Sequence, residues 1–307
     1  MAGYFSPRSM AYRALSQRVV ALTYGQRALA IGATHSLLAQ GTAQSTSNRE
    51  TPYTRLALTA RLFEAVFLGT TEEADRALAF TAKRHATVQG TIDEYGGPAH
   101  PAGERYDAYD PDAMWWTVAF TLDSVEHQYD HLVRRLADRE RQELFEDFVR
   151  WGELFGMPRS AAPRDHADFR QQYDAYLASD RPYLTAEMKQ LGRYIAGYDV
   201  PNQPPLPARP LFSTIHLLTV GSLPPSVRTL FEMEWSRRDE IAYQAVCRSS
   251  RLGHSRIPLL ARSPILRGRS KEFYKIVARG EQDVIRRGGV SMPGVSDVSG
   301  TDRVESA

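Results

Sequence analysis

The sequence predicts an all-α protein built as a single multi-helix domain. Apolar residues recur at helical spacing along most of the 307 residues, and no sustained apolar–polar alternation flanked by hairpin dipeptides occurs. The chain is 42% hydrophobic and 24% charged, which is ordinary for a globular protein, and its length allows a large core. We expect one helical domain over residues 1–287 and a disordered Gly/Ser/Val/Asp-rich tail over residues 288–307.

The predicted helices, in chain order, cover residues 9–43, 52–68, 71–89, 111–137, 139–155, 166–178, 185–197 and 211–261. The first range is one or two helices that loosen near Gly25 and Gly32. Pro52 opens the next helix, because the missing N–H of proline costs nothing in a first helical turn. Thr70 and Glu73 form a capping box at the start of the helix that follows.

Glycine and proline set the remaining boundaries. Gly90 ends the helix over 71–89, a Gly/Pro/Asp-rich loop follows, and Pro111 begins a long helix. Pro224 and Pro225 break the last helical range. The segment DVPNQPPLPARP is extended. We interpret it as a strap over one domain, because the regions before and after it are too short to hold cores of their own.

Composition argues against several classes of function. A net charge of +2 with scattered positive residues does not favour nucleic acid or an anionic membrane as partner. The single cysteine, Cys247, excludes an intrachain disulfide and a Cys-based metal site. Arg8, Arg13 and Arg18 interrupt the N-terminus before a signal-peptide core forms, and no window approaches 18 uncharged apolar residues. We expect a cytoplasmic protein without a membrane span.

The first 49 residues contain no Asp or Glu but carry five arginines: Arg8, Arg13, Arg18, Arg27 and Arg49. One interpretation is a basic helical face that covers an acidic part of the body, and we favour it. The other is a set of guanidiniums that face the acidic groups of a ligand.

Familiar catalytic motifs are absent from the sequence. It contains no HExxH, no pair of ExxH motifs, no GxSxG, no GxGxxG and no phosphate-binding loop. His127 and His131 lie one helical turn apart, with Asp123 one turn before them. They are compatible with a metal site, but the many charges between Glu126 and Arg135 favour a solvated charged face.

His85 is the histidine with the most suggestive surroundings. It shares an apolar helical stripe with earlier residues of its helix: Ala74, Leu78, Thr81 and Ala82. On the preceding helix, Arg55 and Thr59 lie one turn apart on the same side. An arginine and a hydroxyl beside a buried imidazole suit a pocket for an anion or oxygen, although a histidine on an apolar face is more often structural.

An ordered set of motifs resembles the catalytic domain shared by MpaB-type oxygenases and latex-clearing rubber oxygenases. The motifs are RLALT, FLGTTEEADRAL, RHATVQG and YDAYDPDAMWWTVAFTLDSVEHQY, followed by LLTVGSLPPSVRTLFEMEW, and together they span about residues 20–250. The resemblance implies an all-helical fold around a buried haem b. It implies that His85 is the axial iron ligand and that Arg55 and Thr59 lie near the haem, with Leu58 beside Thr59 as a further pocket residue.

On the long helix, Trp115, Trp116 and Phe120 are candidates to line the substrate pocket. We favour core packing for them, because only one of two adjacent tryptophans can face inward.

The sequence departs from that family at two positions. The rubber oxygenases use an upstream acid as a base, whereas this chain has no acid before Glu50 and offers His35, apart from Tyr12 and Tyr24, as the titratable alternative. The residue before Thr59 is Leu58, which cannot ligate iron as a lysine there does, so we expect an open or water-bound distal position. Both departures argue against rubber as the substrate.

Three hypotheses of function follow. The leading one is a haem-dependent oxygenase or peroxygenase, an oxidoreductase that combines dioxygen or peroxide with a small apolar substrate such as an isoprenoid or other alkene. The second is a non-enzymatic haem-binding sensor, carrier or interaction protein. The third is a haem-free helical enzyme or scaffold, because fold alone does not fix function.

Overall fold

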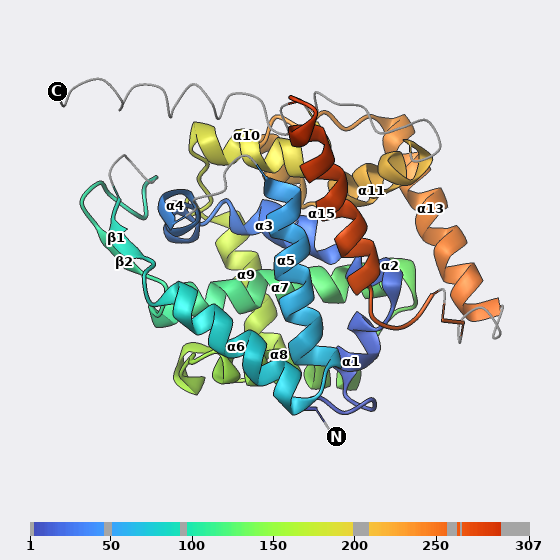
Figure 1. The fold of residues 1–307 in the computed structure, drawn as a ribbon, viewed down its shortest axis with the longest axis horizontal. Coiled ribbons are helices and arrows are strands. Elements are labelled where there is room, and N and C mark those ends of the chain that lie inside the picture. The colour runs from blue at the N-terminus through green and yellow to red at the C-terminus, as the bar shows by residue number, and fades with distance from the viewer. Residues whose placement is uncertain are drawn as a thin grey trace.

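The computed structural model describes residues 3–45, 51–92, 97–198, 209–256, 263–264 and 266–289. Regular structure in these ranges is almost entirely helical (Figure 1), which confirms the predicted fold class. In chain order the helices are α1 (Met10–Leu15), α2 (Arg18–Ala21), α3 (Tyr24–Gly32), α4 (Ser36–Ser45), α5 (Pro52–Leu68), α6 (Thr71–His85), α7 (Pro111–Leu132), α8 (Asp138–Leu154), α9 (His166–Ala178), α10 (Ala186–Ile195), α11 (Arg209–Ser222), α12 (Pro225–Leu230), α13 (Arg237–Arg256) and α15 (Lys271–Arg286), with a 3-10 turn η1 (Arg159–Ala161).

The helix α7 forms the centre of the molecule. It packs against α2, α3, α8 and α13, and it runs across the middle of Figure 1. Trp115 and Trp116 are 2% and 4% exposed, so both members of the pair face protein. The prediction that only one of them would point inward is wrong, because a helix enclosed on all sides has no solvent face.

The N-terminal region is more divided than predicted. Residues 9–43 form four helices rather than one or two. The first break lies at Gln17, whose extended backbone forms an isolated antiparallel bridge with Arg267. Arg18 N donates to the Leu266 carbonyl at 2.9 Å, and Gly268 N donates to the Ser16 carbonyl at 2.8 Å. A contact with a distant part of the chain thus interrupts a locally helical sequence.

The helix α6 also ends earlier than predicted. It stops at His85, and residues Gln89–Thr91 form a strand, β1, that pairs with β2 (Arg105–Asp107). The pairing is antiparallel, with Gly90 opposite Tyr106. Gly90 therefore lies within a strand instead of ending the helix, and part of the predicted 91–110 loop is this hairpin.

The C-terminal helix α15 was not predicted. It packs along α5, as Figure 1 shows, and its cap residue Ser270 donates its backbone N–H to the buried carboxylate of Glu64. The predicted strap lies largely outside the described residues, and so does the predicted tail apart from Gly288 and Gly289. Within the described part of the chain, no helix combines the length and apolarity needed to cross a bilayer.

Candidate functional site

The start of α6 is fixed by side-chain caps. Thr70 Oγ1 accepts from Glu73 N at 3.3 Å, and Glu73 Oε2 accepts from Thr70 N at 3.1 Å, which confirms the predicted capping box. The Arg269 guanidinium then holds the Glu73 carboxylate at 2.9 Å and keeps its pKa below the ordinary value. These contacts set the direction and rotation of α6, and hence the position of His85 at its far end.

The stripe of α6 that leads to His85 is buried at its start and opens toward its end. Ala74 and Ala77 are buried, whereas Leu78, Thr81 and His85 are half-buried. Ala82, which the sequence placed on this stripe, is exposed. Eight residues after Ala74 the helix has turned about 80° past the stripe, so Ala82 points away from it.

The His85 ring packs between two aromatic rings. Phe155 stands perpendicular to it with centroids 4.9 Å apart, and the Tyr109 ring lies 6.4 Å away. The Tyr109 hydroxyl donates to the Ala82 carbonyl at 3.1 Å, which ties this ring to the last turn of α6. His85 Nδ1 is buried without a hydrogen-bond partner. Burial lowers the pKa of His85, so the ring is neutral near pH 7, the form that ligates metals.

Arg55 and Thr59 lie one turn apart near the start of α5 (Pro52–Leu68). Val66, on the same face, is 3% exposed, Arg55 is half-buried, and Thr59 is exposed. The two helices diverge from their connection in Figure 1. Arg55 and Thr59 near the start of α5, and His85 at the end of α6, therefore lie away from that connection, and their placement around one pocket stays a prediction. Leu58 is 41% exposed on the same turn as Thr59.

Arg55 carries a partly desolvated charge. Its guanidinium has no ion pair or side-chain hydrogen bond with any described residue, and burial lowers its pKa. A guanidinium in this setting is a ready partner for a carboxylate supplied by a ligand.

Trp116 and Phe120 lie in a different cluster from His85. Their rings are 5.4 Å apart, and Trp116 packs on Tyr176 at 4.5 Å. No ring contact joins either of them to His85 in the described parts of the chain. The structure thus brings neither of these aromatic rings into contact with His85, and among the described residues no hydrogen bond or ring contact joins His85 to Arg55 or Thr59.

His35 belongs to the same cluster as Trp116 and Phe120, although its local sequence pattern did not single it out as a buried residue. It is 1% exposed, its ring stacks on Tyr176 at 6.0 Å, and neither ring nitrogen has a hydrogen-bond partner. Burial, with His100 and Arg181 nearby, lowers the pKa of His35 to about 3. The only sequence signal was its place as the one histidine before Glu50.

His127 and His131 do not form the solvated face that the sequence favoured. Their rings stack at 4.0 Å, and His127 Nε2 lies 3.2 Å from the Tyr243 hydroxyl. Asp123 and Glu126 on the same helix are buried and ion-paired, so the prediction of a solvated face is wrong. Their carboxylates bind cations from α3, α8 and α9, which cover α7. No group of three metal-ligating side chains occurs among residues that the structure describes.

The acid-free N-terminal segment does cover acidic groups of the body. Arg27 Nη1 contacts Asp123 Oδ2 at 2.5 Å, and Arg13 Nη2 contacts Glu140 Oε1 at 3.2 Å. These pairs support the structural interpretation of the arginines.

A cavity of about 330 Å³ adjoins the surroundings of His85. Its walls come from α4, the β1–β2 hairpin and the start of α7, and they include Leu37, Gln89, Glu104, Arg105, Tyr106, Asp107, Tyr109 and Asp110. Tyr109 therefore borders both this cavity and the His85 ring.

Residues 12–252 match the protein family described as ER-bound oxygenase mpaB/B'/rubber oxygenase, catalytic domain. An uncharacterized protein of Mycobacterium bovis and one of Mycobacterium tuberculosis are each 25% identical to this chain over 211 residues. Each alignment covers 67% of this chain and 76% of the relative. No solved structure matches the chain.

Proposed function

The chain belongs to the family of mpaB and rubber oxygenase catalytic domains, and from this premise we propose that it is a haem b-dependent oxygenase or peroxygenase acting on a small apolar molecule. An isoprenoid or another alkene is the substrate class we favour. Family membership supports oxygenase chemistry, while the haem and the substrate class are the proposal.

The observation that carries the proposal is the state of His85. A half-buried histidine with a lowered pKa and a buried, unpartnered Nδ1 is neutral and unsatisfied, which suits an iron ligand. Phe155 holds the ring edge-on and restricts its rotation. A histidine that served only packing would be expected to have its polar atoms hydrogen-bonded, because a buried orphan nitrogen destabilises the fold.

Arg55 and Thr59 complete the fit. The unpaired guanidinium of Arg55 would bind a haem propionate, which relieves the cost of its partial burial. The exposed Thr59 hydroxyl, one turn away, would donate a hydrogen bond to the oxidant or to substrate. Haem, when bound, supplies the one-electron and dioxygen chemistry that protein side chains lack. Leu58 adds an apolar, non-ligating surface beside Thr59, while Trp116 and Phe120 stay predictions for the pocket.

The test uses the full-length protein produced with haem supplied. We expect a Soret band that co-elutes with the protein and oxygen or peroxide consumption that depends on an added alkene. Protein without haem after supplementation would contradict the cofactor. Haem-loaded protein that consumes no oxidant with any of a panel of isoprenoids and simple alkenes would contradict the enzymatic role and favour a haem carrier or sensor.

A further inference from the structure

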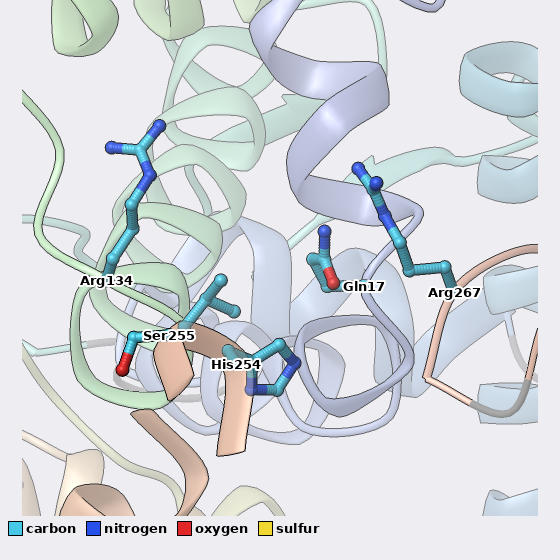
Figure 2. Close-up of a pocket in the computed structure, with 6 residues that line it drawn as sticks. Gln17, Arg134, His254, Ser255 and Arg267 are labelled. Carbon is cyan, nitrogen blue, oxygen red and sulfur yellow. The ribbon is translucent and has the colours of Figure 1, made fainter. Parts of the chain in front are cut away.

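A second cavity, of about 180 Å³, lies on another part of the molecule (Figure 2). It is bordered by the α1–α2 junction, the end of α7, the end of α13 and the segment before α15, through Gln17, Val133, Arg134, His254, Ser255 and Arg267. None of these residues belongs to the surroundings of His85.

His254 brings an unsatisfied acceptor to this cavity. Its Nδ1 lies 2.8 Å from the Ser250 carbonyl oxygen, so Nδ1 carries the proton in the neutral ring. Nε2 then carries a lone pair, and this nitrogen is buried without a hydrogen-bond partner. A ligand that donates a hydrogen bond to Nε2 would satisfy it.

Arg267 brings a positive charge that no carboxylate of the described chain neutralises. Its Nε and Nη2 donate to the side-chain oxygen of Gln17 at 3.1 and 3.3 Å, in the amide orientation that satisfies both groups. Gln17 lies between Arg267 and His254 in Figure 2, which draws its amide oxygen on the histidine side; in the orientation that accepts from Arg267 the two amide atoms exchange places, and the NH₂ group faces the histidine. The backbone bridge between Gln17 and Arg267 keeps the two side chains together.

Arg134 contributes little charge to the cavity. Its guanidinium binds both oxygens of Glu140, at 2.6 and 2.7 Å, and it points away from His254 in Figure 2. The polar groups that the described lining offers to a ligand are therefore the Arg267 guanidinium, the Gln17 NH₂ group, His254 Nε2 and the exposed Ser255 hydroxyl. The guanidinium favours an anion, and the Nε2 lone pair favours an anion that carries a proton to donate.

We propose that this cavity binds hydrogenphosphate, with its charged oxygens facing Arg267 and the Gln17 NH₂ group and its P–OH donating to His254 Nε2. Sulfate has the same shape and charge without the proton, so its oxygen would face the His254 lone pair. A phosphate monoester has also lost its last proton at pH 8, since its second pKa is about 6. The site is thus specific for a tetrahedral oxyanion that still carries a proton.

Calorimetric titration of the full-length protein with sodium phosphate at pH 8 tests the proposal, with sodium sulfate and glycerol phosphate at matched ionic strength as comparisons. We expect one saturable phosphate site and binding of sulfate and of the monoester at least about tenfold weaker. Equal affinity for phosphate and sulfate would overturn the proposal, and so would the absence of saturable phosphate binding.

Variants assign the contacts. Arg267→Gln is expected to weaken phosphate binding about tenfold or more, because a charge-assisted contact is lost. His254→Leu is expected to remove the preference for phosphate over sulfate, and Arg135→Gln, a neighbouring exposed arginine outside the cavity lining, should leave both affinities unchanged. Far-UV circular dichroism checks folding. A folded Arg267→Gln protein with wild-type phosphate affinity would contradict the assignment, and the wild-type phosphate–sulfate comparison stands without any variant.

Discussion

Phe155 holds His85 in an edge-to-face contact, with the ring planes at 88° and the centroids 4.9 Å apart. Phe155 follows the last residue of α8, whereas His85 ends α6, so the contact joins the two helix ends. Phe155, at the end of α8, therefore orients His85, the candidate iron ligand.

Replacing Phe155 with alanine should weaken haem binding by loosening His85. An edge-to-face pair contributes about 0.5–1.5 kcal/mol, so we expect the haem dissociation constant to rise roughly two- to tenfold. Absorbance titration with haem measures it. Phe80→Ala removes an aromatic ring that is 41% exposed on the same helix as His85 and serves as the control. Wild-type affinity in Phe155→Ala would show that the ring contact does not position the ligand.

Arg55→Met should separate ligand binding from folding. The guanidinium is partly desolvated and unpaired among the described residues, so its removal should leave the free energy of unfolding of haem-free protein no lower than in the wild type. Haem affinity should fall about tenfold, because a charge-assisted contact with a propionate is lost. Urea denaturation and haem titration measure the two quantities. A large loss of stability in haem-free protein would instead mark Arg55 as structural.

His35 should make the protein sensitive to acid. Its pKa is about 3 when folded and near 6.5 when unfolded, so the unfolded chain binds the extra proton over that window. This contribution to stability is present above about pH 6.5 and is lost as the pH falls toward 3, by a few kcal/mol. Urea denaturation at pH 7, 5.5 and 4.5 checks it. The unfolding free energy of the wild type minus that of His35→Leu should fall as the pH falls, and a constant value of this difference would refute the assignment.

Asp123→Asn should destabilise the core strongly. Burial opposes the charge of Asp123, but Arg27 and Arg170 outweigh that effect and hold its pKa at about 2. The asparagine leaves Arg27, which is 3% exposed, without a counter-charge, at a cost of about 3–5 kcal/mol. The urea midpoint reports the loss. In the double variant Arg27→Met, Asp123→Leu most of the stability should return; a midpoint as low as in Asp123→Asn would mean that packing, not charge, is responsible.

Capping residues and prolines in the sequence correctly predicted where three helices begin. The capping box at Thr70 and the prolines at 52 and 111 stand where the structure begins α5, α6 and α7. Contacts between residues far apart in the chain set the helix boundaries that were predicted wrongly. The bridge from Gln17 to Arg267 splits the first helical range, and strand pairing takes Gln89, the last residue of the helix predicted over 71–89, into β1. Neither partner is visible from the local pattern.

Helical spacing and the family resemblance singled out Arg55, Thr59 and His85, which lie toward the ends of α5 and α6 that are remote from their connection. That they line one pocket stays a prediction. Trp116 and Phe120 pack with His35 and Tyr176 instead, because α7 is enclosed by several helices and each of its faces meets a different one.

The most direct test of the central claim is the absorption spectrum of His85→Gly after haem loading and gel filtration, with His216→Gly, a half-buried histidine of α11, as the matched control. His85→Gly should lose the co-eluting Soret band, imidazole added during loading should restore the band, and His216→Gly should behave as the wild type. A band of wild-type position and intensity in His85→Gly without imidazole would contradict His85 as the iron ligand.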